Sequence, residues 1–199
     1  PSSAPIITGL VPCNVIAEEI LNDHPRRFRA MVIDSSNPAH SLAGSATFRQ
    51  ALDELDTVVV VDVAMTETAR HADYVLPAAS QFEKWEATFF TFEFPDNTFQ
   101  LRAPLMPPLE GTLPEPEIYA RLVRELGIVS ERRLTILRIA SRLGLTAHTA
   151  VLFTMIGLNR KMLRIAPYLM YETLDRHLPA GGGAAAALWA LALRVSLRH

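Results

Sequence analysis

The sequence predicts an α/β fold: a Rossmann-like open parallel sheet with flanking helices, followed by an all-helical C-terminal segment. Two short apolar runs, 29–34 and 57–62, alternate with segments of helical spacing before residue 80, and the second run is β-branched. Uninterrupted apolar strands that alternate with helices are typical of parallel sheets covered on both faces. From residue 130 onward, apolar residues recur at helical spacing, which predicts several further helices.

In the first part of the chain, helices are expected at 14–21, 45–55 and 66–72, and a third, very short strand at 74–76. Asn14 and Thr66 are expected to cap the first and third of these helices. Cys13 is expected to be a buried free thiol. The strand and helix order favours right-handed crossovers, and ligands of such sheets bind beyond the carboxyl ends of the strands.

The second part begins with a predicted hairpin over 89–102, with its turn at 95–97. A helix is expected over 116–126, because Pro116 suits a first turn and Gly127 suits a helix end. The helix after residue 130 is expected to bury one apolar face. That face consists of Ile136, Ile139, Ala140 and Leu143.

Composition excludes several classes of protein. The net charge of -2 gives no reason to expect a nucleic-acid partner, and the single cysteine excludes an internal disulfide or a cysteine-bound iron–sulfur cluster within the chain. The charge is uneven, because residues 1–117 carry 7 basic and 17 acidic groups whereas residues 118–199 carry 12 basic and 4 acidic groups. An attraction between the halves, or of the basic half for another subunit, is compatible with this asymmetry.

No secretory signal is apparent, and the longest uncharged stretches, 143–159 and 177–193, are shorter than the ~20 apolar residues of a membrane span. We therefore expect a cytoplasmic chain without a membrane span. Residue 1 is not methionine, so we expect that the chain was cut from a longer polypeptide.

Polar residues follow the first two predicted strands. Asp34 is followed by two serines and Asn37, and Asp62 ends the second strand. Because the carboxyl ends of parallel strands meet at one edge of a sheet, these groups predict a ligand site there.

Four segments carry a family resemblance: IDSSNPAHS at 33–41, VVVVDVAMTETARHADYVLPAAS at 58–80, FEKWEAT at 82–88 and PEPEIYARLVRELG at 114–127. Together they resemble the third domain of the molybdopterin oxidoreductases, a family that includes formate dehydrogenases, nitrate reductases and dimethyl sulfoxide reductase. The resemblance implies a dinucleotide-binding domain over residues 1–127 and leaves residues 128–199 as a helical extension or insertion.

The resemblance implies a part of a larger enzyme. Family members hold molybdenum or tungsten between two molybdopterin guanine dinucleotides, and this domain binds the guanosine and pyrophosphate of one of them. The metal ligand and the iron–sulfur cysteines lie in other domains. We therefore expect no catalytic or metal-binding residue here, no tightly bound cofactor and no activity of the chain alone. The expected partners are the remaining domains of the parent, the pterin dinucleotide and an electron-transfer subunit.

Six residues are candidate contacts of that dinucleotide. Asp62 matches the acid that the family places there, and a carboxylate can accept from guanine N1 and N2 or bind ribose. Ser36, Asn37 and Ser41 offer short polar groups after the first strand. The alternatives are a solvated acid at the strand end for Asp62 and a plain turn for Asn37.

Lys84 and Glu117 complete the candidate set. Some family members have a cofactor contact at the position of Lys84, and the family often has an aspartate at that of Glu117. An exposed lysine and an acid that favours the helix start are the alternatives. The chain departs from the family at Ala87, where many members have glycine, so the geometry of the following hairpin is in doubt.

Two other functions are weighed. The large iron–sulfur subunit of respiratory complex I also resembles this family and uses the fold without molybdenum. Asp62 and Asn37 argue for the cofactor-binding interpretation, because a cofactor-free homologue does not need them. An ordinary NAD-binding domain is disfavoured, because no G-x-G-x-x-G motif opens a helix.

Overall fold

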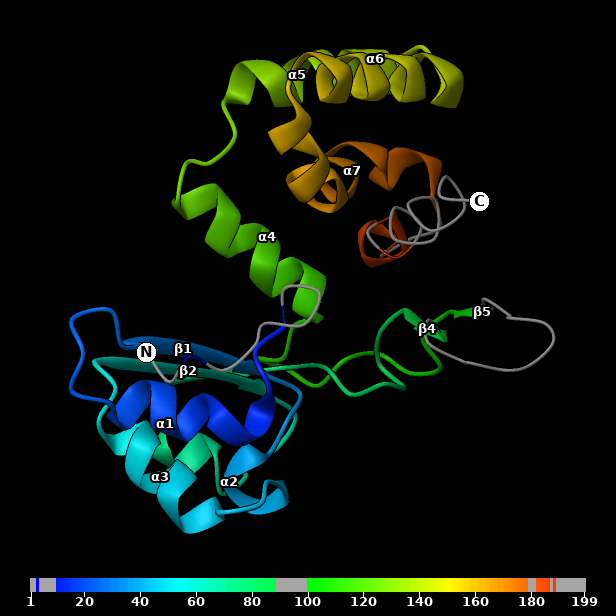
Figure 1. The fold of residues 1–199 in the computed structure, drawn as a ribbon. Coiled ribbons are helices and arrows are strands. Elements are labelled where there is room, and N and C mark those ends of the chain that lie inside the picture. Colours follow the sequence, from blue (N-terminus) through cyan, green and yellow to red (C-terminus); the bar gives the residue numbers. More distant parts are fainter. Residues whose placement is uncertain (1–2, 4–9, 89–99, 179–181, 187, 189–199) are drawn as a thin grey trace, which may run out of the picture. The chain divides into compact units, whose positions relative to one another are not determined.

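The computed structural model (Figure 1) describes residues 3, 10–88, 100–178, 182–186 and 188. The chain divides into two compact units, Pro1–Ala78 and Ala79–His199. Each unit has a hydrophobic core of its own. The predicted boundary at residue 127 separates cofactor binding from the helical extension, and it stays a prediction.

The N-terminal unit is built on a three-stranded parallel sheet, as predicted. Its strands are β1 (Ala30–Asp34), β2 (Thr57–Asp62) and β3 (Tyr74–Pro77), in the order β1-β2-β3. Asp34 lies opposite Val61, and Asp62 lies opposite Pro77. The carboxyl ends of all three strands therefore lie at the same edge.

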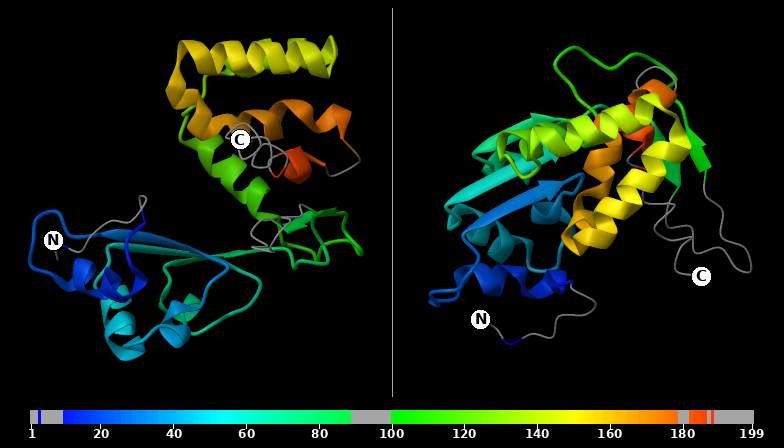
Figure 2. Two further views of the ribbon diagram at one scale, coloured as in Figure 1. Left: turned by 45° about the vertical axis from the view of Figure 1, so that its right-hand side comes forward. Right: turned by 90° about the horizontal axis from the view of Figure 1, so that it is seen from above.

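Helices cover one face of this sheet (Figures 1 and 2). They are η1 (Cys13–Val15), α1 (Ile16–Leu21), α2 (Pro38–Ser41), α3 (Ser45–Asp53) and η2 (Ala69–His71). Phe48 and Leu52 of α3 are buried with Ile33, Val58 and Val60, which alternate along the strands as side chains on one face must. This cluster is the core of the unit.

The expectation of a first strand buried on both faces is wrong. Val32 of β1 is 57% exposed and Tyr74 of β3 is 63% exposed, whereas Ile33 is buried. The exposed residues lie on the sheet face opposite to the helix-covered one. An apolar run alone does not reveal that only one of its faces is covered.

The residues before α1 differ from their prediction. Cys13 is exposed and not a buried thiol. Asn14 is not an N-cap, because a 3-10 turn precedes α1 and the cap position falls on Val15, which makes no side-chain cap hydrogen bond. The sequence spacing of Val15 and Ile16 with the later apolar residues did not distinguish the two kinds of helix.

The C-terminal unit begins with an antiparallel pair, β4 (Glu86–Thr88) and β5 (Gln100–Arg102). Thr88 lies opposite Gln100. The pairing agrees with a hairpin, although the first strand starts before residue 89. The predicted turn at 95–97 lies outside the described residues.

The rest of the unit is helical, as predicted. Its helices are α4 (Glu115–Glu125), α5 (Glu131–Arg142), α6 (Leu145–Leu158), η3 (Arg160–Ile165), α7 (Ala166–Leu174) and η4 (Asp175–His177). Leu137, Leu169 and Met162 lie in their common core, and Met155 packs against it. The end of the predicted helical segment, residues 189–199, lies outside the described residues. None of the described helices combines the length and apolar composition needed to cross a bilayer.

The buried face of α5 is not the predicted one. Leu134, Leu137, Ala140 and Ser141 are buried, whereas three of the four predicted residues, Ile136, Ile139 and Leu143, are exposed. Both sets have helical spacing, so periodicity alone could not select between two apolar stripes.

Candidate nucleotide-binding edge

The loops that follow β1 and β2 lie side by side at the carboxyl edge of the sheet. The backbone N–H of Ser35, the first residue after β1, donates to the carbonyl oxygen of Val61 in β2 at 2.9 Å. Ser35 has a φ of 50°, in the left-handed region that non-glycine residues rarely adopt. The chain therefore turns sharply as it leaves β1, and the candidates Ser36, Asn37 and Ser41 follow this turn.

Asn37 joins the two loops. Its side-chain amide donates to Glu67 Oε2 at 2.6 Å, and its Oδ1 accepts from the Thr68 hydroxyl at 2.8 Å and the Thr68 N–H at 3.2 Å. Asn37 and Asp62 thus belong to the same edge, as predicted. Because both ends of the carboxamide are engaged within the protein, Asn37 acts as a clamp between the loops.

Thr68 is the buried partner in this clamp. Its side chain is fully buried, and its Oγ1 also accepts from the Ala39 N–H at 3.0 Å. Thr66 Oγ1 accepts from the Ala69 N–H at 3.2 Å. The helix expected over 66–72 is only the short 3-10 helix η2, whose N-cap position is Thr68 and makes no side-chain cap hydrogen bond. The prediction of Thr66 as a helix cap is therefore wrong. No contact between the loops was predicted for Glu67 or Thr68. The TET sequence indicated only local hydrogen bonds, whereas the bonds to Asn37 join residues that are distant in sequence.

The clamp changes the acidity of Glu67. The hydrogen bond from the Asn37 amide, with a further one from backbone, stabilises the carboxylate and lowers the pKa of Glu67 below its ordinary value. Glu67 is therefore ionised at neutral pH, and its bond to Asn37 is charge-assisted.

Asp62 and two serines lie at the same edge. Asp62 is partly exposed, and its Oδ1 accepts from the Val63 N–H at 2.7 Å. Within the part of the chain that the structure describes, its Oδ2 accepts no hydrogen bond, and the exposed Ser36 hydroxyl makes none. The Ser41 hydroxyl donates to the backbone oxygen of Asn37 at 3.0 Å. The edge therefore presents one carboxylate oxygen and one hydroxyl that are available to a ligand.

Two exposed apolar side chains follow Asp62 in the chain, and neither was among the predicted site residues. Val63, directly after β2, is 62% exposed, and Met65, two residues further on, is 60% exposed. An apolar side chain beside a carboxylate is the combination that a purine needs, since its faces are apolar and its edge carries hydrogen-bond donors.

The other two candidates belong to the C-terminal unit. Lys84 Nζ forms an ion pair with Glu115, and the two side chains are only 12% and 16% exposed. Lys84 is thus not the exposed lysine of the alternative interpretation. It lines a cavity of about 490 Å³ together with Trp85 and several prolines.

Glu117 lies in the first turn of α4 and pairs with Arg121 at 2.8 Å. It lines a smaller cavity of about 340 Å³, together with Arg124, Glu172 and Asp175. This surrounding is polar, so the side chain remains in a setting where a ligand donor could reach it.

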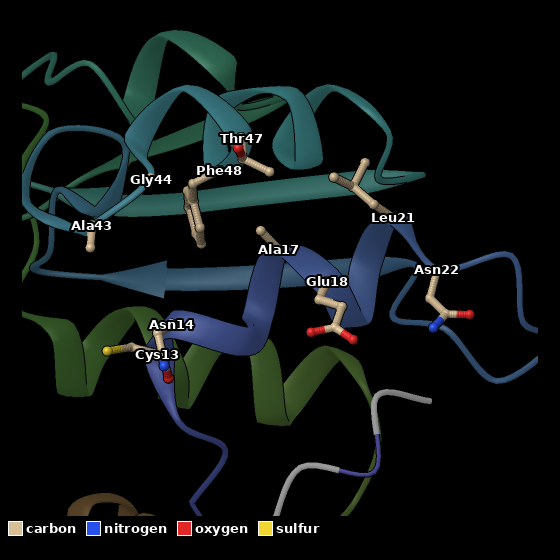
Figure 3. Close-up of a pocket in the computed structure, with 10 residues that line it drawn as sticks. All are labelled: Cys13, Asn14, Ala17, Glu18, Leu21, Asn22, Ala43, Gly44, Thr47 and Phe48. Carbon is tan, nitrogen blue, oxygen red and sulfur yellow. The ribbon is translucent and has the colours of Figure 1, made fainter.

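A further cavity lies in the N-terminal unit, and no candidate residue lines it (Figure 3). It has a volume of about 480 Å³. Figure 3 shows Ala17 of α1 and Phe48 of α3 facing each other across it, with Glu18 as its charged side chain. Because none of the six candidate residues lines it, the cavity has no part in the predicted site.

Comparison with known proteins decides the family. Residues 8–111, just over half of the chain, match the family described as molybdopterin oxidoreductase. The chain belongs to the molybdopterin oxidoreductase family. The predicted resemblance is therefore confirmed at the level of the family, and the assignment to its third domain stays a prediction.

Relatives in this family include reductases and a dehydrogenase. The chain is 44% identical over 57 residues to trimethylamine-N-oxide reductase of Vibrio vulnificus (strain YJ016), which covers 29% of the chain and 7% of the reductase. It is 26% identical over 118 residues to the thiosulfate reductase molybdopterin-containing subunit PhsA of Salmonella typhimurium, covering 57% of the chain and 15% of that subunit.

A third relative is the F420-dependent formate dehydrogenase subunit alpha of Methanocaldococcus jannaschii, 37% identical over 75 residues, which covers 38% of the chain and 11% of that subunit. The chain thus spans only a small part of the length of the molybdopterin oxidoreductases that it matches.

The polar groups at the edge fit the guanosine end of a molybdopterin cofactor. The available oxygen of Asp62 suits the N1 and N2 donors of guanine or a ribose hydroxyl. The hydroxyl of Ser36 can donate to a phosphate oxygen. The Asn37 side chain already bonds Glu67 and Thr68, and only one amide hydrogen is left for a ligand. Its main role is therefore to hold the other groups in place.

Proposed function

We propose that this molybdopterin oxidoreductase chain is a cofactor-binding part of a larger molybdenum or tungsten enzyme. In this proposal, the loops after β1 and β2 hold the guanosine and pyrophosphate of one molybdopterin guanine dinucleotide. The observation that carries it is the available carboxylate oxygen of Asp62 at an edge that the Asn37 clamp holds together.

Each group at the edge has a defined role in the proposal. Asp62 accepts from guanine or ribose, Ser36 donates to phosphate, and Val63 and Met65 contact the apolar face of the base. Ser41 and Asn37 hold the loop backbone. When bound, the pterin cofactor supplies the redox chemistry, and the residues of this chain bind and orient it.

Lys84 and Glu117, in the C-terminal unit, remain proposed contacts of the cofactor. The remaining domains of the parent supply the metal ligand and the iron–sulfur cluster, and an electron-transfer subunit accepts or delivers electrons. The chain alone has only part of the site, so it binds the dinucleotide weakly and is inactive. The parent is expected to be cytoplasmic.

The second candidate is a cofactor-free structural role, as in the large iron–sulfur subunit of respiratory complex I. One observation favours it: the Asn37 side chain already has partners in Glu67 and Thr68, so its presence does not require a ligand. Asp62 is then the residue that separates the two candidates.

Titration with guanosine diphosphate, followed by backbone amide chemical shifts, tests the proposal. We expect shifts at Ser36, Asp62 and Val63 at millimolar nucleotide, and smaller shifts with adenosine diphosphate. Asp62→Asn should weaken the guanine preference at least tenfold, since it replaces a charge-assisted hydrogen bond to guanine with a weaker neutral one (about 1.4 kcal/mol or more).

Asp56→Asn is the matched control, because Asp56 precedes the amino end of β2 and pairs with Arg29 at 2.7 Å. It should leave nucleotide binding unchanged. Equal shifts with both nucleotides, or an unaffected Asp62→Asn variant, would favour the cofactor-free structural role.

A further inference from the structure

The helical part of the chain contains a long stretch without acidic residues. Residues 132–171 carry seven arginine and lysine residues and no aspartate or glutamate. This stretch covers α5, α6, η3 and the start of α7. It lies beyond residues 8–111, which carry the family match. The excess of positive charge is therefore a property of this helical unit.

The outer face of α5 is apolar. Ile136 is 41% exposed, Ile139 is 51% exposed and Leu143, just after the helix, is 78% exposed. Their helical positions are opposite to those of Leu134 and Leu137, which are buried in the core. The three residues form a stripe, here called the α5 stripe, that points away from the core of the unit.

Cationic side chains surround the α5 stripe. Arg132 begins it one turn before Ile136, and Arg133 and Arg142 lie on its two sides. All three are exposed, and none of them forms an ion pair within the described residues. Arg138, in contrast, is bound by Glu131 and Glu172. The charges that flank the stripe are therefore not neutralised by the protein.

The neighbouring elements continue the same chemistry. α6 packs beside α5 (Figures 1 and 2) and contains no aspartate, glutamate, lysine or arginine, and its one histidine, His148, is buried. Leu158, the last residue of α6, is 84% exposed, and the exposed Arg160 and Lys161 follow it. An exposed apolar side chain and two cationic side chains thus also follow one another at the end of α6 and the start of η3.

We propose that the α5 stripe and its flanking arginines dock onto the surface of an anionic lipid bilayer. A helix that lies in a membrane interface presents an apolar stripe to the acyl chains and arginines on either side to the headgroups. The strength of such binding grows with the buried apolar area and with the attraction to anionic lipids, and α5 supplies both contributions. The proposal does not depend on the proposed nucleotide site.

Charge complementarity favours an anionic bilayer as the partner of the α5 stripe. Unpaired arginines on both sides of an exposed apolar stripe match a surface that is negative and apolar together, which an anionic bilayer offers over its whole area. A second copy of the chain could offer acidic residues, because residues 1–117 carry 17 of them. The test therefore includes the oligomeric state.

Co-sedimentation of the 199-residue chain with vesicles tests the proposal. We expect binding to phosphatidylcholine vesicles that contain roughly 30% phosphatidylserine, at least tenfold tighter than to phosphatidylcholine alone, and weakening with salt. Arg132→Gln with Arg142→Gln should reduce binding about 25-fold, since each arginine near such a surface contributes about fivefold. Ile136→Ser with Ile139→Ser should also weaken binding without changing the charge.

The matched control is Arg26→Gln with Arg70→Gln, which removes two exposed arginines of the N-terminal unit and should leave vesicle binding unchanged. Circular dichroism establishes that each variant is folded. Equal binding to neutral and anionic vesicles, or no binding, overturns the proposal. So does self-association of the chain that the Ile136→Ser and Ile139→Ser changes abolish, because the occupant is then a second copy.

Discussion

The hydroxyl of Thr68 donates to the side-chain oxygen of Asn37 at 2.8 Å, across 31 positions of sequence. Thr68 follows β2, and Asn37 follows β1. Because the same threonine oxygen accepts from the Ala39 N–H, one buried side chain orders the backbone of both loops at the candidate nucleotide-binding edge. The loop geometry there is set by the protein before any ligand binds.

Replacement of Thr68 should therefore be more costly than its size suggests. Thr68→Val keeps the shape but leaves the Ala39 N–H and the Asn37 oxygen without this partner in a buried place. We expect a loss of about 2–3 kcal/mol in the free energy of unfolding, measured by urea denaturation.

Thr66→Val is the control, because the Thr66 hydroxyl accepts only the Ala69 N–H among the described residues. The loss of this one local hydrogen bond should cost about 1 kcal/mol. If the two variants are equally stable, Thr68 does not link the loops in the way described.

Removal of either partner of the Lys84–Glu115 ion pair should destabilise the protein. Both side chains are mostly buried, so either partner left alone is a poorly solvated charge. We expect Lys84→Met and Glu115→Gln each to lower the free energy of unfolding by roughly 2–3 kcal/mol.

The double variant should lose clearly less than the sum of the two, because it leaves no uncompensated charge. Arg29→Met removes a pair whose side chains are more than half exposed, and it should change stability little. Strict additivity of the two single losses would show that the charges do not interact.

His148 should make the stability of the helical unit depend on pH. Its Nε2 lies 2.7 Å from Thr173 Oγ1, whose own hydrogen goes to the Leu169 oxygen at 2.6 Å. His148 must therefore donate from Nε2. Burial, with a smaller contribution from the nearby His177, lowers the pKa of His148 below its ordinary value of 6.5.

The sign follows from the proton balance. Below pH 6.5 the unfolded chain binds a proton that the folded His148 does not, so stability is full above that pH and falls as the pH decreases towards the folded-state pKa. The slope should reach at most about 1.4 kcal/mol per pH unit for one group. Urea denaturation between about pH 8 and 5 measures it.

His148→Gln should flatten this dependence, although it also lowers stability at neutral pH. His40→Gln removes an exposed histidine and should keep the slope. An unchanged slope in His148→Gln would assign the pH dependence to other groups.

Sequence patterns predicted the parallel sheet because its strands are short, apolar and followed by polar residues, and each of these signals is local. The partners of the site residues were not predictable in this way. Asn37 finds Thr68 and Lys84 finds Glu115 only because the fold joins segments 31 residues apart. The Thr66 hydroxyl, in contrast, has a local partner, the Ala69 N–H three residues away.

Other predictions differ from the structure where two local arrangements are equally compatible with the sequence. The α5 segment has two apolar stripes of helical spacing, and packing against its neighbours selects Leu134 and Leu137 for the core. The exposure of Cys13 depends on the 3-10 turn that begins there. Composition contains no information about either choice.

The alternation along β1 has a consequence for how this segment tolerates insertions. Met31 and Ile33 face the helices, whereas Val32 is on the other side. One extra residue within the strand would turn the side chains of its later half to the opposite face of the sheet. It would also move Asn37 away from Thr68. The register of β1 therefore depends both on its core residues and on the Asn37 side chain beyond its end. An insertion within the strand would disturb both at once.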